Sequence, residues 1–121
     1  MTKERMEKMM EMHHGIGVET ENGQYYFYEA FDSDFKGAVK RVNDSFSGME
    51  HGKYKVFIAQ SEEVERMKNS NNEEVVVYVT KNRDAVAVLE NQAIRVFENV
   101  NFAIDKLYKA GFIFLSKEVE G

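Results

Sequence analysis

Three histidines, His13, His14 and His51, are the only side chains of the sequence that titrate near neutral pH. His13 and His14 are adjacent, so on a helix they would point about 100° apart and could not easily share a metal ion. His51 belongs to a separate, glycine-flanked segment. We interpret all three as surface residues and expect no metal ion; a metal or proton-transfer site is the less favoured alternative.

Other catalytic patterns are missing from the sequence. The chain has no cysteine, which excludes thiolate catalysis and disulfides, and it has neither a Gly-x-Ser-x-Gly elbow nor a P-loop. Gly15-Ile16-Gly17 begins like a dinucleotide-binding loop, but Thr20 stands where the third glycine belongs. The acid pairs Glu62-Glu63 and Glu73-Glu74 suit a helix start and a strand edge, whereas a carboxylate pair from separate elements stays open. We expect no cofactor.

Methionines near the N-terminus could form a protein-binding surface. Four of the seven methionines lie within residues 6–12, and Met6, Met9, Met10 and His13 share one face at helical spacing. Methionine is flexible and polarizable, so such a face adapts to irregular partners. The helix either packs on its own domain or forms a docking face for another protein or a second copy of the chain.

A β-hairpin is predicted to carry three tyrosines. Asn22-Gly23 is a strong signal for a two-residue turn between the alternating segments 16–20 and 24–31. Such a turn would pair Val18 with Phe27. The predicted core face then consists of Ile16, Val18, Tyr25 and Phe27, and the opposite face consists of Glu19, Tyr26 and Tyr28.

On that opposite face, Tyr26 and Tyr28 are either covered by another layer or offered to a partner. Stacking of nucleic-acid bases needs flanking Lys or Arg, but the neighbours are Glu19, Glu21 and Glu29. Tyrosine is enriched at protein interfaces, so we favour protein contact over base stacking. The predicted protein-contact residues are Met6, Met9, Met10, Tyr26 and Tyr28.

Caps and hydrophobic periodicity predict the elements that position these residues. The helices expected are 2–13 with Thr2 as cap, 35–46 capped by Asp32, Ser33 or Asp34 and stopped by Gly48, a short one starting at 61–64, and one from near Asn99 or Asn101 to Gly111. The further strands expected are 54–59, 75–80 and 112–115. Residues 75–80 are apolar on both faces and should be central in a sheet.

Residues 84–97 have two interpretations. Apolar residues continue at steps of three and four, which suits one long helix. The β-branched residues Val86, Val88, Ile94 and Val96 disfavour a helix and suit two strands, 85–89 and 93–97, with a turn at 90–92. We favour the two strands.

The chain as a whole therefore predicts one α+β domain over residues 1–121. We expect a mixed, largely antiparallel sheet of five to seven strands with two main amphipathic helices packed on it, a peripheral Met-rich helix at 1–14 and a polar tail at 116–121. The 121 residues include 43% hydrophobic and 31% charged side chains, enough for a core and a normal surface. No segment is apolar enough for a membrane span or signal peptide, so we expect a soluble, cytoplasmic protein.

The leading functional hypothesis is a non-enzymatic, regulatory protein-binding module. Its partner would be another protein, a second copy in a homodimer, or both; its size suits an inhibitor or accessory protein, for example one carried by a phage. The net charge of −5, with acids and bases interleaved, disfavours a nucleic-acid partner. The alternatives are a small enzyme or ligand-binding protein with a carboxylate, tyrosine and histidine pocket, and an acidic mimic of nucleic acid.

Overall fold

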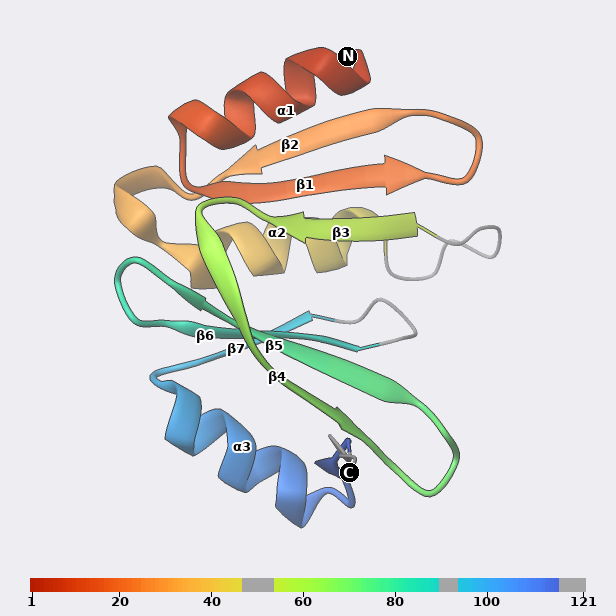
Figure 1. Ribbon diagram of the computed structural model, residues 1–121. Coiled ribbons are helices and arrows are strands. Elements are labelled where there is room, and N and C mark those ends of the chain that lie inside the picture. Colours follow the sequence, from red (N-terminus) through yellow and green to blue (C-terminus); the bar gives the residue numbers. More distant parts are fainter. Residues whose placement is uncertain (47–53, 90–93, 116–121) are drawn as a thin grey trace, which may run out of the picture.

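Five stacked layers make up the α+β fold of the protein (Figure 1). Helix α1 (Lys3–Met12) covers one face of a three-stranded sheet, and α2 (Phe35–Phe46) covers the other face. A five-stranded sheet lies below α2, and α3 (Val100–Lys109) covers its far side. The computed structural model describes residues 1–46, 54–89 and 94–115.

All the strand pairs found in these residues are antiparallel. The first sheet has the order β2-β1-β3, and the second has the order β7-β6-β5-β4-β8. The first sheet is formed by β1 (Gly15–Thr20), β2 (Tyr25–Glu29) and β3 (Tyr54–Ile58). The second is formed by β4 (Ser61–Lys68), β5 (Glu74–Thr80), β6 (Ala85–Leu89), β7 (Ile94–Phe97) and β8 (Ile113–Phe114).

Helix α1 starts at the predicted cap and lies on the first sheet. The Thr2 hydroxyl accepts a hydrogen bond from the Arg5 N–H (3.1 Å), which satisfies one of the free donors of the first turn. Met6 is 2% exposed. A Cβ atom placed on Gly17 of β1 would lie 3.0 Å from the sulfur atoms of both Met6 and Met10. The absence of a side chain at Gly17 therefore lets the methionines approach the strand.

The hairpin between β1 and β2 has a three-residue loop instead of the predicted two-residue turn. The Thr20 N–H donates to the Gln24 carbonyl (2.8 Å), and the Gly23 N–H donates to the Thr20 carbonyl (3.1 Å). Gly23 has a φ of +84°, which is accessible to glycine at little cost. This is the geometry of hairpin loops that end on a left-handed glycine.

The extra loop residue shifts the register by one, so the predicted pairing was wrong. Val18 pairs with Tyr26 and not with Phe27, and Ile16 pairs with Tyr28. Because side chains alternate along a strand, a one-residue shift exchanges the two faces of β2. Tyr26 and Tyr28 therefore share the face of Ile16 and Val18, toward α2, while Tyr25 and Phe27 share the face of Gly17, toward α1.

Helix α2 lies between the two sheets and carries the main core. The Asp34 carboxylate accepts a hydrogen bond from the Gly37 N–H (3.1 Å), which confirms one of the three predicted caps. The amide nitrogen of Asn43 donates to the Ile94 carbonyl of β7 (3.2 Å) and ties the helix to the second sheet. The buried residues of this core come from both sheets and the helix: Ile16, Val18, Ala30, Phe35, Ala38, Val39, Val42, Phe46, Ile58, Val86 and Ile94.

The chain crosses from the first sheet to the second between Ile58 and Ser61. Gln60 turns the chain with a φ of +54°, and the Ser61 hydroxyl donates to the Ile58 carbonyl (2.7 Å). The helix predicted to start at residue 61 was wrong, because these residues begin β4. Seven residues of β4 pair with β5, and this ladder outweighs the local helix-start signal of Glu62 and Glu63, whose side chains are exposed.

Helix α3 begins and ends as predicted. The Asn99 side chain accepts from the Phe102 N–H (2.8 Å). At the other end Gly111 has a φ of +101°, and the Phe112 N–H donates to the Leu107 carbonyl (3.0 Å) in a Schellman motif. The helix closes a second core of Met67, Val75, Val77, Ala85, Ala87, Ala103, Leu107 and Phe112.

The α+β class is confirmed, and so are the central position of β5 and the two strands within residues 84–97. The single sheet of five to seven strands is corrected to two sheets with eight strands in the described residues. The predicted stop at Gly48 and the turn at 90–92 fall outside those residues. No helix in the described parts of the chain is long and apolar enough to cross a membrane.

Candidate functional site

The outer edge of β2 is the candidate functional site. β2 is the end strand of the first sheet, with β1 as its neighbour on one side and no described strand on the other. Its sequence, Tyr-Tyr-Phe-Tyr-Glu, has high β-propensity and contains a single charged residue, Glu29. Edge strands are commonly protected by lysine, proline, bulges or short length. None of these devices is present within β2.

β3, the other end strand of the first sheet, has an exposed lysine, Lys55, and both edges of the second sheet carry protection as well. The end strand β8 pairs with only two residues of β4, so the rest of β4 is also an edge. That part of β4 contains three glutamates and a bulge between Glu63 and Glu65. β7 has only four residues, and the Asn43 side chain occupies the Ile94 carbonyl. The contrast indicates that the edge of β2 is available for pairing.

Hydrogen-bond alternation fixes which groups of β2 point outward. The Ala30 N–H donates to the His14 carbonyl (2.8 Å), and the Thr20 N–H donates to the Gln24 carbonyl. Tyr26 and Tyr28 lie an even number of positions from Gln24 and Ala30, so they also exchange hydrogen bonds with β1. The backbone groups of Tyr25, Phe27 and Glu29 point away from β1.

One of these outward groups already has a partner. The Arg41 guanidinium of α2 donates to the Glu29 carbonyl and lies over the ring of Phe31, 5.2 Å from its centroid. Phe31 is 61% exposed. Arg41 thus closes one end of the edge, and the outward N–H and C=O groups of Tyr25 and Phe27 have no hydrogen-bond partner in the described part of the chain.

The sequence did not reveal Arg41, Phe31 and Glu29 as neighbours of the candidate site. Arg41 lies twelve positions after Glu29 on a separate helix, so their contact depends on how α2 packs. The turn before α2, where Asp32 has a φ of +54°, likewise became visible only in the structure.

The predicted methionine face lies on the first sheet. Met6 is buried, and Met9 and Met10 are half-buried. Met12 points away and is 65% exposed. The structure therefore places Met6 and Met10 against Gly17, on the α1 side of the sheet.

The predicted tyrosines lie on the other side of the same sheet. The rings of Tyr26 and Tyr28 pack edge-on against Phe46 of α2, with centroid distances of 5.6 and 6.1 Å. Tyr28 is half-buried, while Tyr26 is 37% exposed and its hydroxyl donates to the Gln24 side chain (2.8 Å). The sheet thus separates the tyrosine pair from the methionines, and β2 is the strand that carries the tyrosines.

Two of the three histidines lie at the junction of α1 and β1. His13 Nδ1 is 3.4 Å from a carboxylate oxygen of Glu29, which links the end of α1 to β2. The His14 ring packs edge-on against Phe35, and its Nδ1 is buried with no hydrogen-bond partner among the described residues. His51 lies outside the described residues. Within the described ranges, no group of three or more histidine, aspartate or glutamate residues could hold a metal ion.

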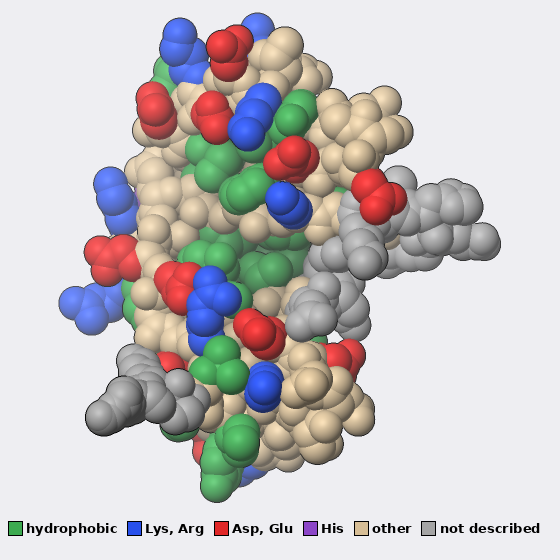
Figure 2. All heavy atoms as spheres, turned by 45° about the vertical axis from the view of Figure 1, so that its right-hand side comes forward, with side chains coloured by type: hydrophobic (Ala, Val, Ile, Leu, Met, Phe, Trp, Pro, Cys, Tyr) green, Lys and Arg blue, Asp and Glu red, His purple; other side chains and the backbone are tan. Residues whose placement is uncertain are grey.

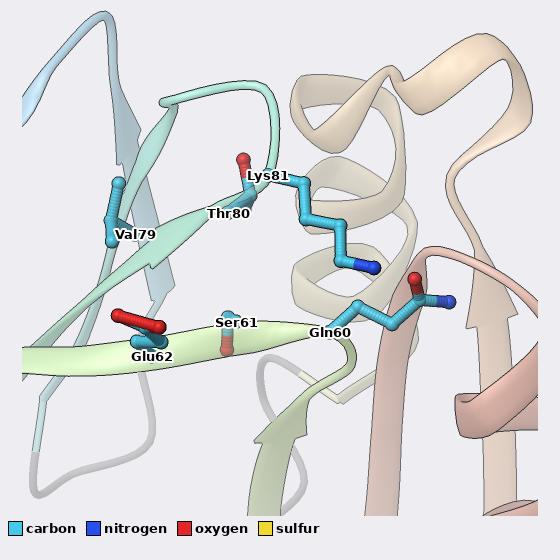
Figure 3. Close-up of a pocket in the computed structure, with 6 residues that line it drawn as sticks. All are labelled: Gln60, Ser61, Glu62, Val79, Thr80 and Lys81. Atoms are coloured by element: carbon cyan, nitrogen blue, oxygen red, sulfur yellow. The ribbon is translucent and has the colours of Figure 1, made fainter.

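A shallow pocket of about 370 Å³ lies where β3 passes into β4 (Figure 3). The long side chains of Gln60 and Lys81 extend close together over it. Thr80 is buried beneath, and its hydroxyl accepts from the Asp84 N–H (3.2 Å). Gln60 is half-buried and donates a long hydrogen bond to the Glu11 carbonyl (3.5 Å), whereas Lys81 is exposed, so the two side chains are not held together in one binding geometry.

A charged cluster borders the second sheet. Arg66 contacts Glu63 (Nε to Oε2, 2.6 Å) and Glu74 (Nη1 to Oε1, 3.7 Å), and its hydrogen bond lowers the pKa of Glu63. Burial raises the pKa of Tyr78, and the charge of Glu63 adds to that effect while Arg66 opposes it. Burial likewise raises the pKa of Tyr54. Burial and the contact between Glu63 and Arg66 account for these pKa shifts.

Apolar side chains are exposed on two parts of the surface. Hydrophobic side chains are visible midway down the face shown in Figure 2, between charged side chains of both signs. Large apolar side chains are also exposed where α3 meets β8, notably Tyr108 at 62% and Ile113 at 60%. This apolar end precedes residues 116–121, which the structure does not describe.

Comparison with known proteins finds no matching family model, no matching curated protein and no matching solved structure.

Proposed function

We propose that the protein is a non-enzymatic protein-binding module, and that it binds by pairing the outer edge of β2 with a strand of another chain. The observation that carries the proposal is the outward row of backbone groups at Tyr25 and Phe27 in a strand without edge protection. Strand addition of this kind uses main-chain hydrogen bonds for affinity and side chains for specificity.

The side chains of β2 supply the apolar part of such a contact. Tyr26, at 37% exposure, offers a rigid ring with a polar tip on the α2 side. Phe31 and Arg41 lie at one end of the strand, and aromatic residues and arginine are the types enriched in binding hot spots. Tyr28 supports the edge by packing on Phe46.

A variant pair at Tyr25 tests the proposal. Because the Tyr25 N–H points outward, Tyr25→Pro removes a donor from the free edge and leaves the β1–β2 ladder intact, a position where strands tolerate proline. Tyr25→Ala is the matched control, since it removes the same side chain but keeps the N–H. We expect affinity capture from the native cell to recover a partner with the wild type and Tyr25→Ala, and to lose it with Tyr25→Pro.

A third variant tests the methionine helix. Met9→Glu places a charge on the half-buried side of α1, where Met9 and Met10 remain candidate contact residues. Loss of the partner with Met9→Glu and retention with Tyr25→Pro would transfer the binding surface from β2 to α1. Equal recovery with all three variants would contradict both surfaces.

We also propose the wider setting of this activity. The lack of cysteine suits a reducing cytoplasm, and the small size suits an inhibitor or accessory protein, such as one carried by a phage. The interleaved charges and the net charge of −5 support a protein partner over nucleic acid.

A further inference from the structure

We propose that Asn22 is a self-modification site, at which the folded hairpin deamidates to isoaspartate or aspartate. Asn22-Gly23 is the only Asn-Gly pair in the sequence, and glycine hinders the reaction least because it has no side chain. The inference does not depend on the proposed binding function, since the reaction takes place within one chain and needs only water and hydroxide from the solvent.

The reaction is a ring closure between neighbouring groups. Hydroxide removes the proton of the Gly23 main-chain N–H, and this nitrogen attacks the side-chain carbonyl carbon (Cγ) of Asn22. A bond forms between the two atoms, the bond from Cγ to the amide nitrogen breaks, and the released nitrogen leaves as ammonia. Water then opens the succinimide ring at either carbonyl. The attack is intramolecular, so the reacting atoms need no encounter in solution.

The loop leaves the reacting groups open to solvent. Glu21, Asn22, Gly23 and Gln24 are all exposed. A Cβ atom placed on Gly23 would have no atom within 4 Å beyond its chain neighbours, so no packed side chain obstructs the attack or the entry of hydroxide. The Asn22 amide nitrogen, which is the leaving group, has no hydrogen-bond partner in the described part of the chain.

Two hydrogen bonds restrain the reacting groups in the folded loop. The Gly23 N–H donates to the Thr20 carbonyl (3.1 Å), and the Thr20 hydroxyl donates to the Asn22 side-chain oxygen. The Gln24 N–H donates to the same hydroxyl (2.9 Å) and orients it. Each of the two restraining bonds contributes about fivefold, so folding should slow the ring closure by about 30-fold.

Asn69-Ser70 provides a comparison within the same chain. The Asn69 side-chain oxygen accepts from the N–H groups of Asn71 (3.0 Å) and Glu73 (2.9 Å). Its amide nitrogen donates to the Glu73 carboxylate (2.8 Å). Ser70 also carries a side chain beside the attacking nitrogen. The Asn69 amide is thus held at both ends, and we expect it to react much more slowly than Asn22.

Deamidation would change the hairpin in two ways. A carboxylate replaces a neutral amide, so the net charge of −5 becomes −6, and the new charge joins Glu19 and Glu21 in the same hairpin. Isoaspartate carries the main chain through its side-chain carbonyl, which adds one carbon atom to the loop backbone before Gly23. The hydrogen bond from the Gly23 N–H to the Thr20 carbonyl then loses its geometry, and the hairpin end of β2 changes as the protein ages.

Mass spectrometry of the folded protein during incubation at mildly alkaline pH tests the proposal. The intact mass should rise by the difference between an amide and a carboxyl group, peptide mapping should place the change at Asn22, and an isoaspartyl methyltransferase should label the product. The chain unfolded in urea should react no more than about 30-fold faster. Asn22→Gln is the matched control, because it keeps the amide but would have to close a larger ring, and it should show no change at position 22.

Thr20→Val separates the effect of the hydroxyl from that of solvent exposure. It keeps a β-branched side chain at the end of β1 and frees the Asn22 oxygen, so deamidation should be at least about fivefold faster than in the wild type. Three results would overturn the proposal: no mass gain at Asn22 in the folded protein while the unfolded chain reacts, faster reaction at Asn69 than at Asn22, or no acceleration in Thr20→Val. The first two are measured on the wild type and stay decisive if a variant does not fold.

Discussion

Replacing Met6 by alanine distinguishes a structural role of the methionine helix from a docking role. Met6 is 2% exposed and packs on Gly17, so Met6→Ala removes a buried side chain and leaves a cavity beside β1. Replacing a buried methionine by alanine lowers the free energy of unfolding by about 2–5 kcal/mol. We expect the lower half of that range, because Met10 lies beside the cavity and the peripheral helix α1 can shift to fill part of it. Urea unfolding followed by circular dichroism measures the loss.

Met12→Ala is the matched control on the same helix. Met12 is 65% exposed, so its replacement should change the free energy of unfolding by less than about 0.5 kcal/mol. A cost below about 0.5 kcal/mol for Met6→Ala would refute the reasoning, because it would mean that α1 contributes little by packing on the sheet. An unchanged m-value in both variants is needed for the comparison, since the slope reports the surface exposed on unfolding.

Three further changes give predictions at other sites. Gly111→Ala places a side chain at a φ of +101° and should cost about 1 kcal/mol or more in thermal or urea unfolding. Asn99→Ala removes the α3 cap and should lower the free energy of unfolding by about 1 kcal/mol. Asn99→Asp keeps an acceptor oxygen and should retain most of the stabilisation that the cap provides. Burial raises the pKa of Tyr78 above its ordinary value of 10.0. The resulting stabilisation of the folded state is present below pH 10 and is lost as the pH rises through the folded pKa. Tyr78→Phe should therefore lose less stability at alkaline pH than the wild type, as measured by urea unfolding at a series of pH values.

Local chemistry made the ends of the helices predictable. Thr2, Asn99 and Gly111 act through groups within a few residues of themselves, so sequence spacing alone identifies them. The same holds for the strands of residues 84–97, where β-branched side chains outweigh a helical repeat.

Long-range geometry was not predictable. One extra loop residue before Gln24 reversed both faces of β2, and the Asn22-Gly23 signal suits either loop length. Residues 61–64 have a helix-like start, but their conformation is decided by pairing with β5, which the local sequence does not contain. The contact of Arg41 with β2 likewise depends on helix packing, so the candidate site became visible only in three dimensions.

The position of α2 between the two sheets has a consequence for synthesis on the ribosome. The first sheet and α2 are complete once β3 has been made, yet the side of α2 that faces the second sheet is covered by Val86 and Ile94, which are translated later. Until β6 and β7 emerge, the nascent chain carries an uncovered apolar helix face next to an open β2 edge. The first half of the chain is therefore the part most in need of protection from aggregation while translation continues.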